Sequence, residues 1–515
     1  MSGDRLLPAG ISRRLFCAAR LLAMLLFTLP AVAQAQFSFT TNADGTLNIA
    51  GYSGSATAVT IPGTNNGLPV TSIGNGAFSN NRSLSSVTIP DGVTNLGTMA
   101  FGNCPSLTNV LIGSGVTSIG SNAFYYCSAL TNVIIPSGVT GIAPATFDAC
   151  TSLTSLTIPD GVTNIGVEAF GGCQSMTSLN IPNGVTSIGV EAFSGCANLT
   201  SISIPNGVPE IEDNAFDGCL SLTNILIPDS VTNIGQFAFA SCRGMTSINI
   251  PKSVAGIGTG AFVDCSSLVA ITANPLSPVY SSVGGVLFNK NQTTIVLYPP
   301  GDVGPYTIPN SVVSLGQYAF YYCANLTGIT IPGSVTNIGR DSFADCGVTS
   351  VTIPSGVTSI GSGAFDSCEG LTNVTISSSV TDIEGSAFEE CFSLRGVYFM
   401  GNNPGIASTV FQGTPATGYY LPGTMGWTMN TGFLHIVPWN PQAQTSDGSF
   451  GVRTNQFGFN ITGNSNLVVV VETSASLADP SWSPVATNIL TSGLSYFSDP
   501  QWTNYPSRFY RLSMP

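Results

Sequence analysis

Charged and ionisable side chains are scarce in this sequence, and its 515 residues include a single histidine. Only 8% of the residues are Asp, Glu, Lys or Arg. A Ser-His-Asp or Cys-His catalytic set would have to use His435, which lies in the apolar stretch GFLHIVPW, so a structural role is the better interpretation. No phosphate-binding loop and no calcium-loop series of Asp residues occurs. We therefore predict no catalytic residue, no cofactor and no metal site, and a protein that is not an enzyme.

Basic residues are the scarcer of the two charged classes, with 13 Lys and Arg against 26 Asp and Glu and a net charge of -13. Such a surface repels nucleic acid and anionic lipid, so we expect no nucleic-acid partner. The acidic residues are thinly spread. Glu168 and Glu191 lie one repeat apart, and Glu210, Glu212 and Asp213 form the densest cluster. A solvated face explains both better than an acid pair or a cation site does.

Long apolar runs are also missing, apart from Leu21–Leu29 near the N-terminus. Arginines precede this run and small residues follow it, which is typical of an export signal over residues 1–35 that is cleaved before Gln34 or Gln36. Ser12–Phe16 (SRRLF) also resembles a twin-arginine signal, so the export route stays open. The run is too short to span a membrane, and no later stretch qualifies. We expect an exported protein, secreted or held in the cell envelope.

What the sequence has in abundance is one repeated unit of 23 residues. A leucine or methionine recurs at this spacing without a slip at Leu84, Leu107, Leu130, Leu153, Met176, Leu199, Leu222, Met245 and Leu268. A fixed period of this length indicates stacked identical units rather than a globular core with a pocket. In the unit LTSLTIPDGVTNIGVEAFGGCQS (Leu153–Ser175), LTSLTIP alternates as a half-buried strand that ends at Pro159. Val162 and Ile165 predict a short second strand, and VEAFGGC predicts one helical turn.

Phenylalanine and cysteine each keep one position in the unit. We expect equivalent rings such as Phe170, Phe193 and Phe216 to stack inside the solenoid at about one strand spacing, ~4.8 Å. The cysteines would then point the same way into the coil, as a ladder of buried thiols, with disulfides between adjacent coils as the alternative. One cysteine per coil without histidine makes no metal site. The ladder comprises Cys104, Cys127, Cys150, Cys173, Cys196, Cys219, Cys242, Cys265, Cys323, Cys346, Cys368 and Cys391.

The unit CxxLTxLxIPxxVTxIGxxAF resembles the BspA-like class of bacterial leucine-rich repeats over about residues 40–400. The resemblance implies a β-rich solenoid of parallel strands and an adhesion-type role outside the cell. Proline follows the strand here, where the general leucine-rich repeat has Asn or Cys, so the usual asparagine ladder is not expected. The predicted fold is this solenoid, with a short helical turn in each coil, followed by a small C-terminal all-β module.

The period breaks in three places, which suggest the domain boundaries. The repeat that starts at Leu268 is twelve residues longer than the others and contains a predicted hairpin in Gly284–Gly301. One residue is missing between Cys346 and Cys368, and the period fades after Leu394. We expect a signal peptide (1–35), a solenoid (37–400), a C-terminal cap (401–437), a polar linker (438–449) and a β module (450–515).

The candidate binding residues come from two positions of the unit. Outward strand positions carry small polar side chains, as at Ser155, Thr157, Ser178 and Asn180, and suit extended contact with a protein or a glycan. The tyrosine pairs offer large contact areas at little entropic cost, at Tyr125, Tyr126, Tyr321 and Tyr322. The sequence favours a protein that binds an extracellular protein or glycan. A structural spacer that displays the C-terminal module, which would anchor or bind carbohydrate, is the alternative.

Overall fold

The computed structural model describes residues 36–428, 430–431, 434–478 and 480–515. The predicted export signal and its cleavage site before Gln34 lie outside the described residues. The chain divides into two compact units, Met1–Phe239 and Ala240–Pro515, each of which is a stack of coils. None of the helices among the described residues has the length and hydropathy needed to cross a membrane.

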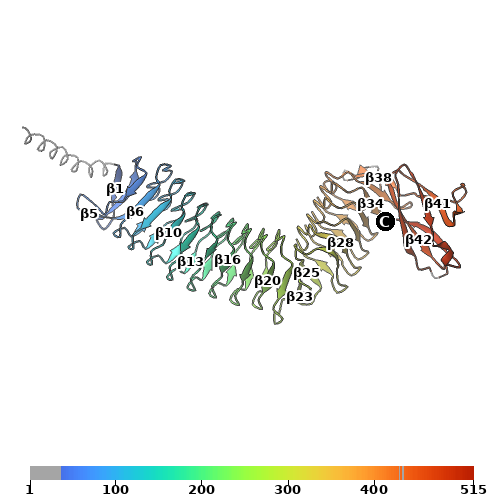
Figure 1. Cartoon of the computed structure of the whole chain (residues 1–515), viewed down its shortest axis with the longest axis horizontal. Helices are drawn as coiled ribbons and strands as arrows, with labels where there is room; N and C mark the ends of the chain where they lie inside the picture. The colour runs from blue at the N-terminus through green and yellow to red at the C-terminus, as the bar shows by residue number, and fades with distance from the viewer. Residues whose placement is uncertain (1–35, 429, 432–433, 479) are drawn as a thin grey trace, which may run out of the picture. The chain divides into compact units, whose positions relative to one another are not determined.

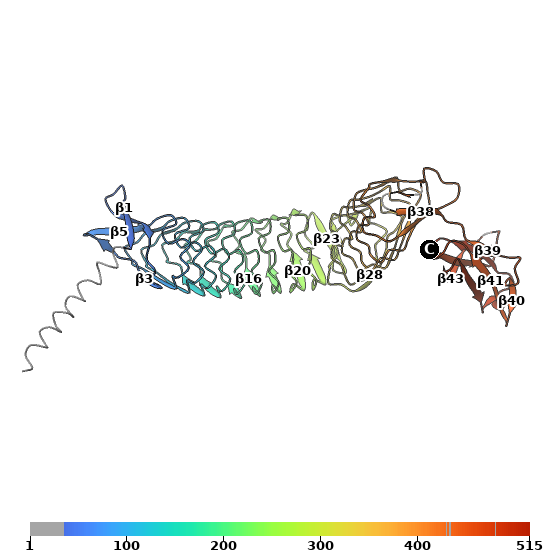
Figure 2. The ribbon, with the colours of Figure 1, turned by 90° about the horizontal axis from the view of Figure 1, so that it is seen from above.

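The first unit stacks parallel strands on two sides of its coils (Figures 1 and 2). The first strands of neighbouring coils pair in parallel through most of the unit, and so do the two-residue second strands. The first strands are β3 (Ala58–Thr60), β6 (Ser86–Ile89), β8 (Asn109–Ile112), β10 (Asn132–Ile134), β12 (Ser155–Thr157), β14 (Ser178–Leu179), β16 (Ser201–Ser203) and β18 (Asn224–Leu226). The second strands are β7 (Asn95–Leu96), β9 (Ser118–Ile119), β11 (Gly141–Ile142), β13 (Asn164–Ile165), β15 (Ser187–Ile188), β17 (Glu210–Ile211) and β19 (Asn233–Ile234).

The N-terminal end of this unit is covered by an antiparallel pair. Strand β1 (Phe37–Thr41) lies antiparallel to β2 (Leu47–Tyr52), which pairs with β5 (Leu68–Ile73) of the first coil. The short β4 (Thr64–Asn65) folds back on β5. The Tyr52 ring stacks on Phe78, so the pair also closes the end of the aromatic column.

The segment expected as a helical turn in each coil is a series of tight turns instead. Glu168 has a φ of +54° and Gly172 a φ of +63°, which no right-handed helix accommodates. Alternate amides leave the coil, since those of Glu168 and Phe170 donate to Val190 and Ala192 of the next one. The amide of Gly171 closes a turn onto the carbonyl of Glu168. The helix prediction was wrong because its backbone donors serve the neighbouring coil.

The core of each unit is a column of aromatic rings beside the cysteine ladder. From Phe101 to Phe239, neighbouring rings lie 5.4–5.7 Å apart and nearly parallel, which confirms the predicted stacking. This separation lies in the range that offset aromatic stacking prefers. The Cys173 thiol donates to the carbonyl of Phe147 at 3.3 Å. All twelve repeat cysteines are buried, and none of them forms a disulfide in the described part of the chain.

Threonine hydroxyls tie the coils together on the outside. The hydroxyl of Thr117 donates to the carbonyl of Thr94 at 3.3 Å, and that of Thr154 donates to Thr131 at 3.1 Å. The same bond recurs along both strand rows. The repeated threonines therefore stabilise the stack rather than serve only as surface residues.

The second unit is built from the same kind of coil. Its first strands are β20 (Ser247–Ile250), β22 (Ala270–Ala273), β26 (Gly304–Thr307), β28 (Leu326–Thr330), β30 (Ser350–Ile353), β32 (Asn373–Ile376), β34 (Gly396–Phe399), β36 (Thr417–Tyr420) and β38 (Leu434–Pro438), which also pairs with β37 (Asn430–Thr431). Its second strands are β21 (Gly256–Ile257), β25 (Thr294–Leu297), β27 (Ser314–Leu315), β29 (Asn337–Ile338), β31 (Ser359–Ile360), β33 (Asp382–Ile383) and β35 (Gly405–Ile406). Strands β36 and β38 extend the first-strand sheet through the segment expected as a cap.

The twelve-residue insertion forms a meander inside this unit. Strand β24 (Val286–Asn289) pairs antiparallel with β25, which confirms the predicted hairpin. It also pairs with β23 (Tyr280–Val283), a strand that the sequence did not indicate. Strand β25 then joins the second-strand sheet beside β27.

The C-terminal residues form two antiparallel sheets. The elements are β39 (Gln442–Gln444), β40 (Gly451–Arg453), β41 (Gln456–Thr462), β42 (Leu467–Ser474), β43 (Ser483–Leu490), β44 (Leu494–Asp499), the short helix η1 (Trp502–Asn504) and β45 (Phe509–Ser513). Strand β39 lies in the stretch expected as a linker and pairs with β41. The outward-facing rings of Tyr398 and Tyr419 share a buried cluster with residues of this module.

The thiol ladder leads to a first prediction. Burial raises the pKa of the Cys150 thiol to about 12 and also raises the pKa of Cys173. Because only the thiolate reacts, buried thiols with a raised pKa such as Cys150 and Cys173 should resist iodoacetamide in the native protein. All twelve repeat cysteines should react once the protein is denatured without reductant. Peptide mass spectrometry measures both states. Cysteines that stay blocked until a reductant is added would show disulfides and contradict the ladder.

Candidate functional site

The outer face of the first strands is a regular surface of the first unit. Side chains alternate along each strand, so two positions per coil point outward. Ser155, Thr157, Ser178 and Asn180 all lie exposed in these two rows. Equivalent residues of neighbouring strands lie side by side in each row, as Asn132 of β10 lies beside Ser155 of β12. The face is therefore a flat array of short polar side chains.

Three apolar side chains interrupt this polar face at the same coil position, two of them adjacent and the third, Leu226, apart from them. Leu111 is 57% exposed and Ile134 is 66% exposed. The register of β8 and β10 aligns Val110 with Val133, which places Leu111 next to Ile134 in the same row. Exposed apolar neighbours of this kind mark contact surfaces. Sequence reasoning missed them, although NVLI and NVII replace the alternating SLTI at these strands.

The tyrosine pairs do not lie on this face. Tyr126 is 48% exposed and Tyr125 is half-buried, and both lie in the turns that follow the second strand. Tyr321 and Tyr322 are half-buried in the second unit. Burial and the nearby Asp345 carboxylate raise the pKa of Tyr321 to about 12. The eight predicted binding residues thus divide between two sides of the coil and two units, and no single site gathers them.

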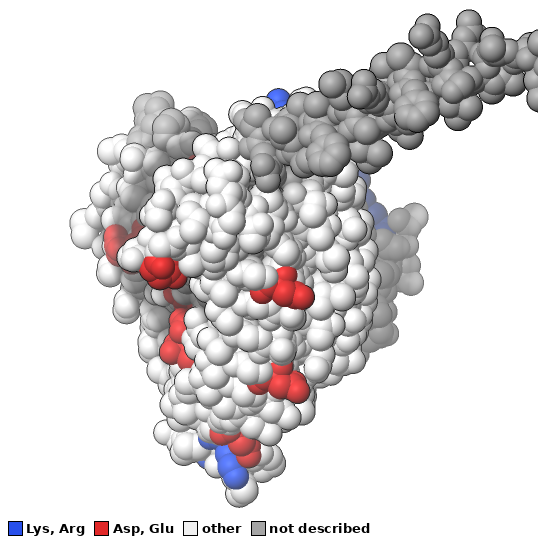
Figure 3. All heavy atoms as spheres, turned by 90° about the vertical axis from the view of Figure 1, so that its left-hand side faces the viewer, with Lys and Arg blue, Asp and Glu red and all other residues white. Residues whose placement is uncertain are grey.

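Acidic side chains appear as scattered patches on a mostly uncharged surface (Figure 3). Asp148 was not among the predicted site residues. Its pKa rises to about 6, first because of burial and second because of the charges of Glu168 and Glu191. Burial, with Glu210 and Asp213 adding to it, also raises the pKa of Glu212. No group of three or more potential metal ligands comes together among the described residues.

His435 lies in strand β38, opposite Thr417 of β36. Its side chain is exposed, between the buried Leu434 and Ile436. The described cysteines are all buried in the coils, where burial raises the pKa of thiols such as Cys196, to about 12. A low thiol pKa is what activates a catalytic cysteine, and Cys196 has the opposite shift.

These features define a parallel β-solenoid repeat protein with an extended outer face. The family model for the BspA type leucine rich repeat region matches residues 52–177, 163–291 and 303–417, with six copies. The chain therefore belongs to the family of BspA-type leucine-rich repeat proteins.

Solved structures of similar proteins come from several bacteria. A leucine rich cell surface protein from Faecalibacterium prausnitzii is 32% identical, with 72% of this chain and 94% of that chain covered and a TM-score of 0.46. A leucine-rich repeat protein from Bacteroides ovatus is 29% identical over 70% and 93% of the two chains, with a TM-score of 0.47. The T. pallidum leucine rich repeat protein is 26% identical over 45% and 88%, with a TM-score of 0.32. Among curated proteins, none matches this chain.

Because the pKa of Asp148 is raised, replacing its carboxylate with a neutral side chain should stabilise the folded protein, and this stabilisation should depend on pH. Its ordinary pKa is 3.8 and its folded value is about 6, so ionisation costs more in the folded state than in the unfolded one. This free-energy cost is absent at pH values below the pKa of the unfolded state. It grows as the pH rises from 3.8 to about 6, and it reaches its full size above the pKa of the folded state. Asp148→Asn should therefore raise the melting temperature at pH 7.5 but change it little at about pH 4.

Thermal unfolding of both proteins at the two pH values measures this difference. Asp160→Asn, at an exposed carboxylate in the turn after β12, is the matched control. An equal effect of Asp148→Asn at both pH values would contradict the shifted titration.

Proposed function

We propose that this protein is an exported, non-enzymatic repeat protein that binds other macromolecules, an extracellular protein or a glycan, at the bacterial cell surface or outside the cell. The observation that carries the proposal is the outer face of the first strands. It offers many equivalent positions across several coils, with Leu111 and Ile134 exposed side by side among polar neighbours. An apolar centre within a polar surround is the usual anatomy of a binding surface.

Membership of the BspA-type family supports a binding role. The 32% identical relative is described as a cell surface protein, which supports the same location here. Export itself is proposed from the charged and apolar pattern of residues 1–35. The non-enzymatic assignment is proposed from the sequence, whose single histidine, His435, lies in an apolar stretch.

The second candidate is a spacer that displays the C-terminal module. The observation in its favour is the buried cluster of Tyr398 and Tyr419 with Phe459, Ile461 and other module residues. The Thr375 hydroxyl also donates to the carbonyl of Pro515 at the chain end. These contacts attach the module to the last coils, as a spacer requires. In this case the module, not the solenoid, would anchor the protein or bind carbohydrate.

Binding through the outer face predicts a loss of affinity when its apolar pair is removed. A panel of extracellular matrix proteins and glycans first identifies a partner of the purified protein. The double substitution Leu111→Ser and Ile134→Ser should then weaken that binding by about 2 kcal/mol or more, because central apolar anchors dominate interface energies. Both side chains are exposed, so the fold should tolerate the change.

Two matched variants locate the contact. Leu226→Ser changes an isolated apolar side chain at the same coil position and should have a smaller effect. Tyr126→Ala tests the turn side of the coils instead. If only Tyr126→Ala weakens binding, the outer face is not the binding surface. If the Leu111/Ile134 variant, Leu226→Ser and Tyr126→Ala all bind normally, the C-terminal module carries the interaction, as the spacer alternative requires.

A further inference from the structure

The second unit contains one coil whose outer turn is shortened. In ordinary coils five residue steps separate the second-strand Ile or Leu from the core aromatic ring, as from Leu315 to Phe320. In the inserted coil only three steps separate Ile295 from Tyr298. Tyr298 nevertheless occupies the aromatic column, since its ring stacks on Phe320 at 5.0 Å and its amide donates to the carbonyl of Ala319. Two residues of the outer turn are therefore missing.

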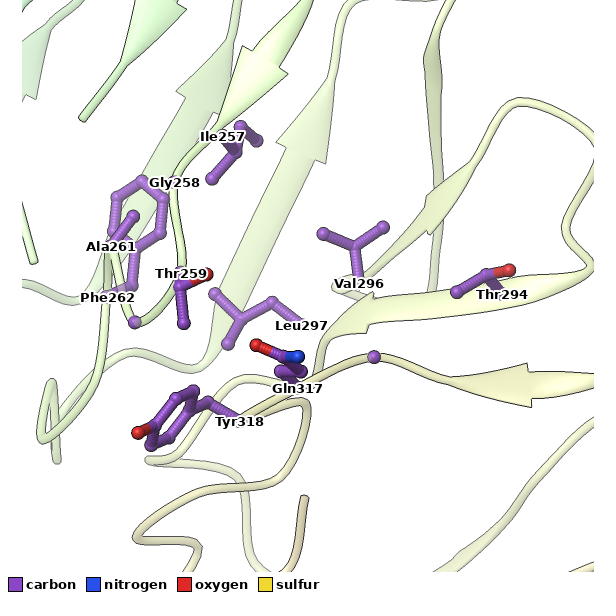
Figure 4. Close-up of a pocket in the computed structure, with 12 residues that line it drawn as sticks. Ile257, Gly258, Thr259, Ala261, Phe262, Thr294, Val296, Leu297, Gln317 and Tyr318 are labelled. Atoms are coloured by element: carbon purple, nitrogen blue, oxygen red, sulfur yellow. The ribbon is translucent and has the colours of Figure 1, made fainter. Parts of the chain in front are cut away.

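This deletion opens a hollow of about 280 Å³ between two normal coils (Figure 4). The turn from Gly258 to Ala261 forms one wall, and Gly316, Gln317 and Tyr318 form the other. Val296 and Leu297 of the short coil line the hollow between the two walls. Ile257, whose equivalents at Ile234 and Ile338 are fully buried, is only partly buried here. The hollow thus follows from a specific change in coil length.

The polar groups that line the hollow are uncharged, and some of them can still form hydrogen bonds with a ligand. Thr259 and Gln317 are exposed, and Gln317 forms no hydrogen bond with another described residue. In ordinary coils the amide equivalent to that of Gly260 donates to the next coil, as the amide of Asn122 does to Pro144 at 3.0 Å. No carbonyl of the described part of the short coil accepts from Gly260. Two residues that line the hollow, Gly260 with its backbone N–H and Gln317 with its side-chain amide, therefore have hydrogen-bonding groups without a partner among the described residues.

The ring of Tyr318 is held in place at the rim. Its edge-to-face contact with Tyr321 has a centroid separation of 5.3 Å, and its hydroxyl hydrogen-bonds the Asp341 carboxylate. A fixed ring offers contact area without an ordering cost. Figure 4 shows this ring and the Gln317 amide on the same side of the hollow, beside Leu297.

We propose that this hollow binds a neutral pyranose unit of an oligosaccharide. None of the residues that line it is charged, so a carboxylate or a phosphate would lose hydration without a counter-charge. A wholly apolar ligand would leave the Gly260 amide and Gln317 unpaired. A pyranose has both an apolar C–H face, suited to Leu297 and Tyr318, and hydroxyls that pair with the amides. The volume suits one sugar unit, because it lies just below the usual range of drug-sized pockets.

A neighbouring hollow supports an oligosaccharide rather than a free sugar. It has a volume of about 350 Å³ and shares Gly316 and Gln317 with the first. Asn337, Arg340 and Glu384 line its far part, so its surface is more polar. The next sugar of a chain would lie there and hydrogen-bond to these side chains. No residue is shared with the Leu111 and Ile134 surface, so the two proposals stand independently.

The test uses the purified full-length protein with maltotriose, cellotriose and chitotriose as probes. Saturation-transfer NMR detects binding, and calorimetry gives the dissociation constant. At least one probe should bind. Gln317→Ala should raise its dissociation constant about tenfold, equivalent to the loss of one good hydrogen bond. Val296→Trp, which fills the hollow from a partly exposed position, should abolish binding.

Gln236→Ala is the matched control, because Gln236 occupies the same coil position as Gln317 in a coil that does not border the hollow. It should bind like the unmodified protein. The proposal is overturned if none of the three probes binds at millimolar concentration. It is also overturned if Val296→Trp and Gln317→Ala bind as well as the control, or if N-acetyl-phenylalaninamide binds the hollow where the sugars do not. Melting temperatures of all variants verify that they fold.

Discussion

Stacking of each coil on its neighbours is the interaction on which the whole structure depends. No coil has a core of its own, since the Phe170 ring is covered by Phe147 on one side and Phe193 on the other. The backbone also depends on the neighbouring coil, because alternate amides of the turn, such as that of Phe170, donate their hydrogen bonds to the next coil. Stability is then a sum of nearest-neighbour interfaces, which explains why the unit length is so strictly maintained.

This dependence decides what could be predicted from the sequence. The strands, the ring column and the thiol ladder follow from a period that places identical residues at identical positions. The helical turn was predicted wrongly, because VEAFGGC shows which side chains are buried but not where its amides donate. Tyr398 and Tyr419 could not be placed either. Both rings are buried by residues of the C-terminal module, which lie far from the two tyrosines in the sequence.

The candidate binding surface was predicted only in part, for a related physical reason. Outward positions such as Ser155 and Thr157 were recognised because the strand alternates, and they are exposed. Leu111 and Ile134 were overlooked, because a leucine in a strand is more readily taken for a core residue. The hollow beside Gln317 depends on the length of a coil rather than on any motif. Aligning Ile295 and Tyr298 with the ordinary unit would have revealed the two missing residues.

Outward strand positions are where such a protein can acquire contacts without loss of stability. Tyr398 and Tyr419 occupy the same coil position as Leu111 and Ile134, and there they stack 5.2 Å apart and bury almost completely against the module. In the second unit, side chains at this position therefore already pack against another folded part of the same chain. Because the core side chains lie on the inner side and the strand hydrogen bonds join backbone groups, changing the outward residue leaves the stack intact. Leu111 and Ile134 offer the same kind of surface, uncovered in their own unit, and this is the physical basis of the proposal that they bind a partner.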